Sequence, residues 1–373
     1  MTDFASLIAA DRSQKARPIH LVDKDSFGDW AKARPAADRS ILAALRFDGK
    51  TANAMALLPR GEDFEVVAAV ANVAKLTPWC LSKLAETLPD GAYRLAEGDP
   101  GSAALGWLLA QHRFRTYKTK EESAHGPRVL VSGEAARIDD MIRLAEATAL
   151  VRDLVNTPAG DLGPAEIEES VRRLAKEIHA QVRVTQGDEL AGGYPLVQAV
   201  GGAASRERAP RLIELTWGKP SHPAIAIIGK GVCFDSGGLD IKSAAGMRLM
   251  KKDMGGAAHA LALARLVAGA KLPVRVHLLI PAVENAVAAD ALRPGDIVKS
   301  RLGLQVEIDN TDAEGRLILA DALAKAAEDK PELILDFATL TGAARVALGP
   351  DLPALFANDD DLLLGLETAA REV

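Results

Sequence analysis

The stretch "PAIAIIGKGVCFDSGGLDIK", Pro223–Lys242, decides the fold. It opens with a continuous apolar run, which is typical of a strand buried on both faces of a parallel sheet. Lys230, Asp235 and Lys242 follow that run. Because ligands of open α/β sheets bind at the carboxyl ends of strands, these three residues are candidates for a functional site.

Strands and helices alternate along the chain from Pro164 onward. Apolar runs predict strands at 211–217, 223–229, 274–283 and 332–340, and helical patterns occupy 165–180, 255–270 and 314–329. This alternation predicts an α/β protein with a largely parallel sheet covered on both faces. We expect a smaller N-terminal α/β domain (1–135), a long linker helix (136–156) and a C-terminal domain (157–373) with a mixed, largely parallel sheet flanked by helices.

Composition excludes several classes of function. The chain has 373 residues, a formal net charge of −6 and only 4% aromatic residues, which argues against broad affinity for nucleic acid or anionic lipid. No window approaches the ~18 uninterrupted apolar residues of a membrane span. The two cysteines form no disulfide framework, and the N-terminus does not resemble a signal peptide, so we expect a cytoplasmic protein.

Four acids gather at predicted strand ends and helix starts. Asp253 precedes the helix in "MKKDMGGAAHAL", and Asp312, Glu314 and Arg316 alternate in "NTDAEGRL". Taken alone, each of these acids has a simpler interpretation, because Asp is a common N-cap and acids are favoured near the positive end of a helix. Together with Asp235 they would repel one another strongly unless cations neutralised them.

Two divalent metal ions held by shared carboxylates would provide that neutralisation. Such a pair would also make a nucleophile from water and stabilise both oxygens of a tetrahedral intermediate. The residues alone therefore predict a two-metal hydrolase, without indicating which bond it cuts.

Two segments resemble the signature regions of the leucyl aminopeptidase (cytosol aminopeptidase) family of dinuclear metallopeptidases. They are "GKGVCFDSGGLDIKSAAGMRLMKKDMGGAA" and "NTDAEGRLILADAL", of which the octapeptide Asn310–Leu317 is very specific. The resemblance is strong over about 150–350 and weak in the N-terminal domain. It implies that the C-terminal domain is a catalytic metallopeptidase domain.

The resemblance also implies roles for individual residues. The family's metal ligands correspond to Lys230, Asp235, Asp253, Asp312 and Glu314. Lys242 corresponds to the catalytic lysine that polarises the scissile carbonyl, and Arg316 to the arginine that holds a bicarbonate ion. Positions that bind the substrate correspond to Met250, Asn310, Thr339, Leu340 and Gly342.

The implied reaction is hydrolysis of the N-terminal peptide bond of a peptide with a free N-terminus, with preference for leucine or another apolar residue. Mn²⁺, Zn²⁺ and Co²⁺ suit carboxylates with one amine, and Mg²⁺ is a further candidate. A homohexamer is the implied assembly. Family members usually continue for roughly another hundred residues beyond Val373, so the resemblance implies a C-terminally incomplete catalytic domain.

Two alternatives remain open at this point. One is an inactive or truncated homologue in which the metals are structural. The other is a regulatory or DNA-binding member of the same fold, against which the charge of −6 counts.

Overall fold

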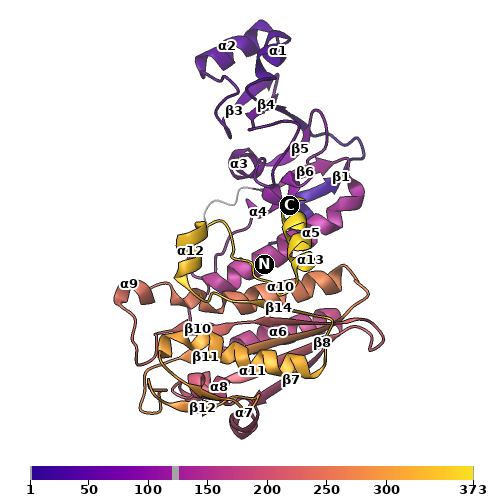
Figure 1. Ribbon diagram of the computed structural model, residues 1–373. Helices are drawn as coiled ribbons and strands as arrows, with labels where there is room; N and C mark the ends of the chain where they lie inside the picture. The colour runs from indigo at the N-terminus through magenta and orange to yellow at the C-terminus, as the bar shows by residue number, and fades with distance from the viewer. Residues whose placement is uncertain (1, 120–125, 373) are drawn as a thin grey trace. The chain divides into compact units, whose positions relative to one another are not determined.

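The computed structural model describes residues 2–119 and 126–372, and the chain forms two compact units (Figure 1). The first comprises Met1–Ala149 with Leu355–Val373, and the second comprises Leu150–Ala354. Both combine helices with a mixed sheet, so the predicted α/β class is confirmed. The boundary lies within helix α5 (Ile138–Asn156), which covers most of the predicted linker helix.

The first unit is built around a six-stranded sheet in the order β1-β6-β5-β2-β4-β3, in which only the β3–β4 pair is antiparallel. Its strands are β1 (Ile8–Ala10), β2 (Arg17–Val22), β3 (Met55–Arg60), β4 (Asp63–Ala69), β5 (Gly91–Leu95) and β6 (Arg128–Ser132). Its helices are η1 (Phe4–Leu7), α1 (Phe27–Lys32), α2 (Ala36–Ala44), α3 (Ser82–Thr87), α4 (Ala103–Leu109), η2 (Ala135–Arg137) and α13 (Asp360–Glu372).

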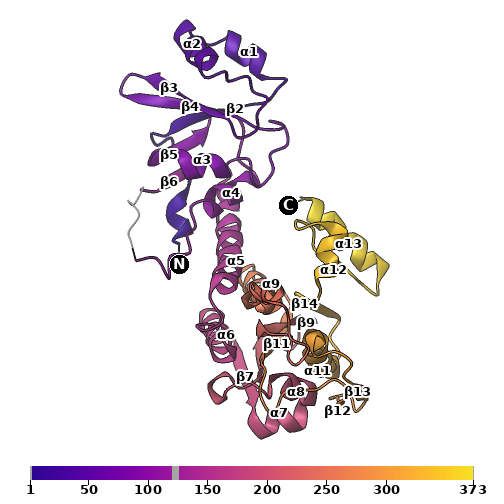
Figure 2. The same ribbon diagram turned by 90° about the vertical axis from the view of Figure 1, so that its left-hand side faces the viewer.

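Two hydrophobic clusters hold the first unit together. Leu42 of α2, with Phe27 of α1 beside it, packs against Leu58 of β3 and Val67 of β4. The larger cluster centres on Trp107 and includes residues of η1, α3, α4 and the first part of α5. Figure 2 shows α1 and α2 beyond strands β3 and β4, on the side away from α3 and α4.

The second unit contains a six-stranded sheet and a separate two-stranded one. Its strands are β7 (Gln181–Gln186), β8 (Arg211–Trp217), β9 (Ala224–Gly229), β10 (Gly231–Asp235), β11 (Arg275–Asn285), β12 (Ile297–Lys299), β13 (Gln305–Glu307) and β14 (Leu333–Phe337). Its helices are α6 (Pro164–Ile178), α7 (Gly187–Gly193), α8 (Pro195–Gly201), η3 (Arg206–Arg208), α9 (Ala244–Met247), η4 (Met250–Met254), α10 (Gly255–Gly269), η5 (Thr311–Ala313), α11 (Glu314–Glu328) and α12 (Gly342–Leu348).

The main sheet of the second unit runs β14-β9-β11-β8-β7, and β10 also pairs with β11. Strands β14, β9, β11 and β10 are parallel, whereas β8 is antiparallel to both of its neighbours. The predicted mixed, largely parallel sheet is therefore confirmed. Strand β10 continues the line of β9 along β11, because β9 pairs with residues 275–279 of β11 and β10 with residues 282–285. The parallel strands therefore bring their carboxyl ends to one edge, which is where ligands of such sheets bind.

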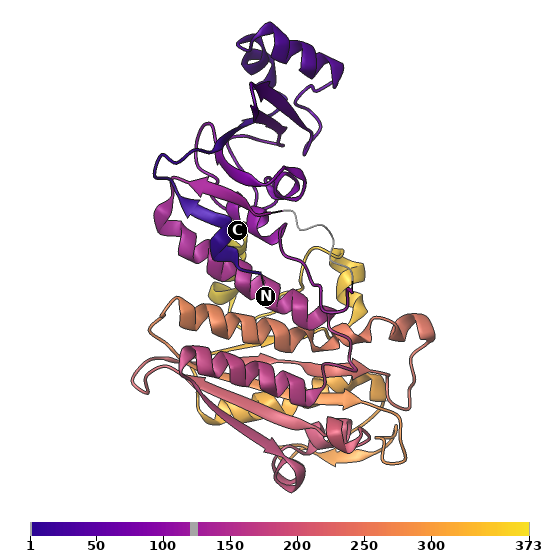
Figure 3. The ribbon, with the colours of Figure 1, turned by 180° about the vertical axis from the view of Figure 1, so that it is seen from behind.

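Helices cover both faces of this sheet, which explains why β9, with the sequence AIAIIG, is apolar without interruption. Leu278 and Ile280 of β11 face the cluster formed with α6 and α10, while Leu279 and Val283 face the one formed with α7, α8 and α11. The two layers are visible from opposite sides in Figures 1 and 3. The core of this unit thus fixes α10 and α11 against the strands whose ends carry the polar residues.

Asp321, another acid of the "NTDAEGRLILADAL" segment, has a structural position. Its side chain is fully buried within α11, and one carboxylate oxygen accepts hydrogen bonds from the first-turn N–H groups of α8, at Leu196 (2.8 Å) and Val197 (3.4 Å). The other oxygen accepts from the N–H of Arg301 (2.8 Å). Asp321 therefore satisfies backbone donors that a helix start leaves without partners.

We expect Asp321→Ala to lower the free energy of unfolding by ~1–3 kcal/mol, because buried donors lose their acceptor. Urea unfolding of the variant and of the parent chain measures this difference. Unchanged stability would contradict the role of this carboxylate.

Candidate metal centre

The parallel strands carry four polar residues near the same edge of the sheet, of which Lys230 lies between β9 and β10. Lys230 follows β9, Asp235 ends β10 and Asn285 ends β11. Thr339 lies just beyond β14, and the N–H of Lys230 donates to the carbonyl of Phe337 (2.9 Å). Because adjacent strands hold these positions, the sheet itself sets their spacing.

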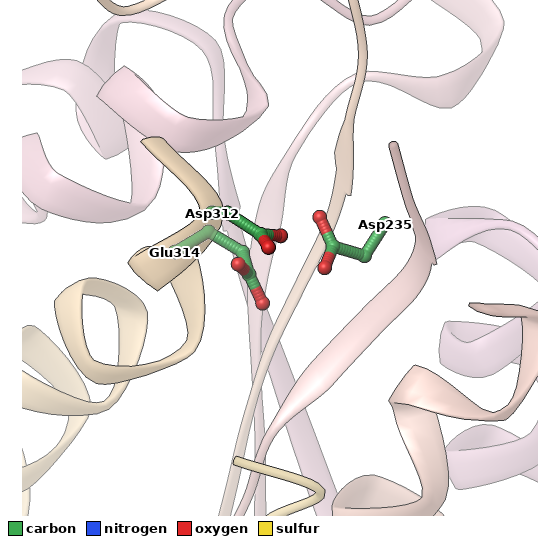
Figure 4. Close-up of side chains that lie close together, drawn as sticks. All are labelled: Asp235, Asp312 and Glu314. Atoms are coloured by element: carbon green, nitrogen blue, oxygen red, sulfur yellow. The ribbon is translucent and has the colours of Figure 1, made fainter. Parts of the chain in front are cut away.

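Three carboxylates converge at this edge. Asp235, Asp312 and Glu314 each offer an oxygen, and these oxygens all lie within 4.8 Å of one another (Figure 4). Asp312 belongs to η5 and Glu314 is the first residue of α11, so both approach Asp235 from the same segment. Asp235 and Glu314 are buried, whereas the Asp312 side chain is 32% exposed.

Two lysines lie among the acids. The buried Lys230 ammonium is 2.7 Å from Asp253 Oδ2 and 2.8 Å from Glu314 Oε1. Lys242 Nζ is 2.8 Å from Asp235 Oδ2 and also pairs with Asp312. Four carboxylates and two lysines therefore form one connected group.

Electrostatics at this edge favour the binding of further positive charge. Burial raises the pKa of Glu314 to about 7, and nearby Asp235 and Asp253 also raise it, against the opposing effect of Lys230. Burial likewise raises the pKa of Asp312. Neighbouring negative charges make Glu314 hold its proton more tightly, and a multivalent cation would relieve the same repulsion.

Burial acts on the pKa of a lysine in the opposite direction, because the charged form of a lysine is the protonated one. Burial alone would lower the pKa of Lys230, but the attraction of Asp253 and Glu314 outweighs it and the net shift is upward. The pKa of Lys242 is also raised, since its contacts with Asp235 and Asp312 outweigh its burial. Both lysines are therefore ammonium groups at neutral pH.

Two glycines make room for Lys230. A Cβ at Gly315 would lie 2.6 Å from Cε and 2.8 Å from Nζ of Lys230. At Gly256, in the first turn of α10, a Cβ would lie 2.0 Å from the carbonyl oxygen of Phe337 and 2.9 Å from the backbone nitrogen of Lys230. The glycines of "MGGAA" and "EGR" thus permit a close approach of both helices.

Asp253 is held from several sides. Its Oδ1 accepts a hydrogen bond from the Thr339 hydroxyl (2.9 Å) and lies 3.0 Å from Lys252 Nζ. The same hydroxyl lies 3.0 Å from the backbone oxygen of Asp253, and Lys230 Nζ donates to the Thr339 carbonyl (3.3 Å). Thr339, which the resemblance assigned to the substrate pocket, therefore contacts two of the expected metal ligands.

The other expected site residues lie outside this connected group. Arg316 is exposed, and no hydrogen bond or ion pair holds its guanidinium among the residues that the structure describes. The Asn310 side chain accepts a hydrogen bond from the N–H of Asp312 (2.7 Å). Met250 is half-buried at the start of η4, Leu340 is 48% exposed, and Gly342 begins α12.

The structure adds Asn285 and Thr311 to the set of residues around the acids. Both are buried, and the Asn285 amide contacts Asp235 and the Thr311 carbonyl. The sequence offers one signal for Asn285, since it is a polar residue at the end of an apolar strand. Its partners lie 50 and 26 residues away, so sequence spacing gives no indication of the contacts.

The donor set fits a divalent metal ion. Carboxylate oxygens suit hard and borderline divalent ions, and one amine nitrogen is compatible with Mn²⁺, Zn²⁺ or Co²⁺ once it has lost its proton. Fold and site together define an α/β protein with a carboxylate-rich centre of the kind that holds such ions.

The chain belongs to the cytosol aminopeptidase family. The model of that family's catalytic domain matches residues 149–373, and the model of the M17 aminopeptidase N-terminal domain matches residues 17–127. This confirms the family resemblance found in the two signature segments.

Individual relatives agree with this assignment. A probable cytosol aminopeptidase of Rhodococcus jostii is 41% identical over an alignment of 278 residues, which covers 70% of this chain and 54% of the relative. The chain thus spans about half the length of the curated relatives it matches.

Solved structures show the same fold. The cytosol aminopeptidase from Coxiella burnetii superposes with a TM-score of 0.91 at 42% identity, covering 98% of this chain and 80% of that one. The bottromycin maturation enzyme BotP in complex with Mn superposes with a TM-score of 0.83 at 30% identity, covering 96% and 80%. Among the helices that the structure describes, none has the length and apolar character needed to cross a membrane.

We expect Gly315→Ala to lower the free energy of unfolding by ~1–3 kcal/mol, because the added methyl group overlaps the buried Lys230 side chain. Gly192→Ala is the matched control, since a Cβ there meets no atom within 4 Å. Chemical denaturation of both variants gives the comparison. Equal stabilities would mean that Lys230 has room that the packing does not indicate.

Proposed function

We propose that this chain is a metal-dependent aminopeptidase that removes the N-terminal residue of peptides, with preference for leucine or another apolar residue. The observation that carries the proposal is the convergence of Asp235, Asp312 and Glu314 between two lysines at the edge of the sheet. Family membership supports it, as does the Mn in the BotP complex. The free α-amine of the substrate is the feature that would restrict cleavage to the chain end.

Five residues would hold two divalent metal ions: Lys230, Asp235, Asp253, Asp312 and Glu314. When bound, the ions would supply Lewis acidity and lower the pKa of water at the site. Asp235 and Glu314 are the proposed shared carboxylates, and Lys230 would bind through Nζ as the neutral amine, after giving up its proton. Mn²⁺ and Zn²⁺ are the proposed ions, with Co²⁺ and Mg²⁺ as alternatives.

Lys242 would act on the substrate. Its ammonium group lies at the edge of the acid cluster with a side chain 15% exposed, and its raised pKa keeps it protonated at neutral pH. A protonated Nζ would donate a hydrogen bond to the scissile carbonyl and stabilise the oxyanion that forms there. The flanking Asp235 and Asp312 orient it.

Arg316 would hold a bicarbonate ion that serves as general base. Its guanidinium is exposed and lies two residues after Glu314, and a planar fork of donors suits a bidentate anion. The proposed substrate-binding residues are Met250, Asn310, Thr339, Leu340 and Gly342. The proposed assembly is a homohexamer in the cytoplasm.

We expect the 373-residue chain to release p-nitroaniline from leucine p-nitroanilide when Mn²⁺ is added, and to stop when a chelator is added. Absorbance of the product measures the rate, and hydrolysis of the corresponding glutamate substrate tests the apolar preference. Binding of Mn²⁺ without any hydrolysis would instead favour a homologue whose metals are structural.

We expect Glu314→Ala to abolish high-affinity Mn²⁺ binding and nearly all turnover, because a shared carboxylate is lost. Equilibrium dialysis and the same assay measure the two effects. Glu307→Ala, at an exposed position of β13, is the control and should show the Mn²⁺ binding and turnover of the parent chain. Normal turnover of the Glu314 variant would refute its assignment as a ligand.

Lys242→Ala has a different expected profile. Mn²⁺ binding should persist while turnover falls by ~10²-fold or more, the scale of losing an oxyanion donor. Lys299→Ala, at an exposed position of β12, is the control for removal of a lysine charge. Loss of the metal from the Lys242 variant would mean that this residue has been given the wrong role.

A further inference from the structure

Asn285 joins three chain segments behind the acid cluster. It is 5% exposed, and its Nδ2 donates to Asp235 Oδ1 (2.9 Å) and to the Thr311 carbonyl (3.1 Å). The backbone carbonyl of Asn285 accepts hydrogen bonds from both the N–H (3.2 Å) and the hydroxyl (2.7 Å) of Ser236. The side-chain amide thus connects β11 with the end of β10 and with the segment that carries Asp312 and Glu314, and the backbone carbonyl holds the loop after β10.

Thr311 completes the connection between the two loops. Its hydroxyl lies 2.7 Å from the carbonyl of Gly237, and its N–H donates to Asp240 Oδ2 (2.7 Å). In return, the N–H of Asp240 donates to the Thr311 hydroxyl (2.9 Å). The segment 310–314 is therefore fixed relative to residues 236–240 by reciprocal hydrogen bonds.

The Asn285 amide also determines which oxygen of Asp235 faces the site. Oδ1 accepts from the Asn285 amide and from the N–H of Gly237 (2.9 Å), whereas Oδ2 faces Lys242 (2.8 Å). With Oδ1 occupied by two donors, the carboxylate has one preferred orientation. Hydrogen bonds of this kind orient metal ligands and tune their affinity.

We propose that Asn285 is a positioning residue that sets the distance and orientation of Asp235 relative to Asp312 and Glu314, and thereby the affinity for divalent metal. This inference rests on the proposed function. Asn285 makes no contact with Lys242 among the hydrogen bonds and ion pairs that the structure describes, so it acts only through the acids.

The environment of Asn285 admits few other side chains. Gly238 has a positive φ of 67°, and a Cβ there would lie 3.0 Å from Asn285 Oδ1 and 2.9 Å from the Thr311 hydroxyl. A leucine would keep the branched outline of asparagine but leave buried acceptors without their donor. A serine would keep one donor on a shorter side chain.

The test is equilibrium dialysis of the purified 373-residue chain and its variants against MnCl₂. Asn285→Leu should raise the Kd for Mn²⁺ by ~10–100-fold, the range seen when partners of metal ligands are removed. Asn285→Ser should give an intermediate Kd, because a hydroxyl donor restores part of the contact. If the leucine variant does not fold, the serine variant alone decides the matter.

Asp321→Ala is the control, because it removes a buried carboxylate from the same unit at a site away from the acids. It should lose stability and keep the parental Kd for Mn²⁺, which separates positioning from general destabilisation. Parental Kd values in both Asn285 variants would overturn the inference and leave the proposed function intact. Absence of Mn²⁺ binding in the parent chain would overturn both.

Discussion

The buried ammonium of Lys230 is the interaction on which the second unit depends. A charge that is 2% exposed is stable only with close partners, and here Asp253 and Glu314 supply them at 2.7 and 2.8 Å. Removing one partner of such a group leaves an uncompensated charge, which costs several kcal/mol, on the order of 3–5. The strand β9 and the helices α10 and α11 must therefore assemble together.

This requirement explains the small residues around the lysine. The two carboxylates that pair with Lys230 lie at helix starts: Asp253 lies just before α10, and Glu314 is the first residue of α11. Acids are stabilised at these positions by the positive end of the helix. Gly256 and Gly315 then allow the helices to approach the strand closely enough for the carboxylates to reach Nζ.

Much of this arrangement follows from the sequence. The apolar runs around Ala224–Gly229 and Arg275–Asn285 predicted buried strands, and the polar residues after the first run indicated the edge at which a site would form. Such features are local, because hydrophobic periodicity and strand-end positions depend on a few neighbouring residues. The resemblance in "NTDAEGRL" then gave each acid an expected role.

Other features depend on contacts between distant segments and could not be predicted. Asp321 shares a segment with the site acids, yet two of its partners lie on α8, more than a hundred residues away. The Thr339 hydroxyl contacts Asp253 across 86 residues, although the resemblance placed this residue only in the substrate pocket. No local sequence pattern distinguishes a carboxylate or hydroxyl that hydrogen-bonds to the backbone from one that faces a ligand.

The sheet explains why the site is built at strand ends and not on free loops. Lys230 and Asp235 lie along β9 and β10, which both pair with β11, while Asn285 ends β11 and Thr339 follows β14, so backbone hydrogen bonds fix the distances between them. The other acids come from outside these strands: Asp253 belongs to η4, and Asp312 and Glu314 belong to the segment that Asn285 and Thr311 attach to the sheet edge. A carboxylate cluster needs such rigidity, because mutual repulsion would otherwise drive its members apart. The neutral amide of Asn285 suits this position, since it adds two donors to the cluster without adding a fifth negative charge.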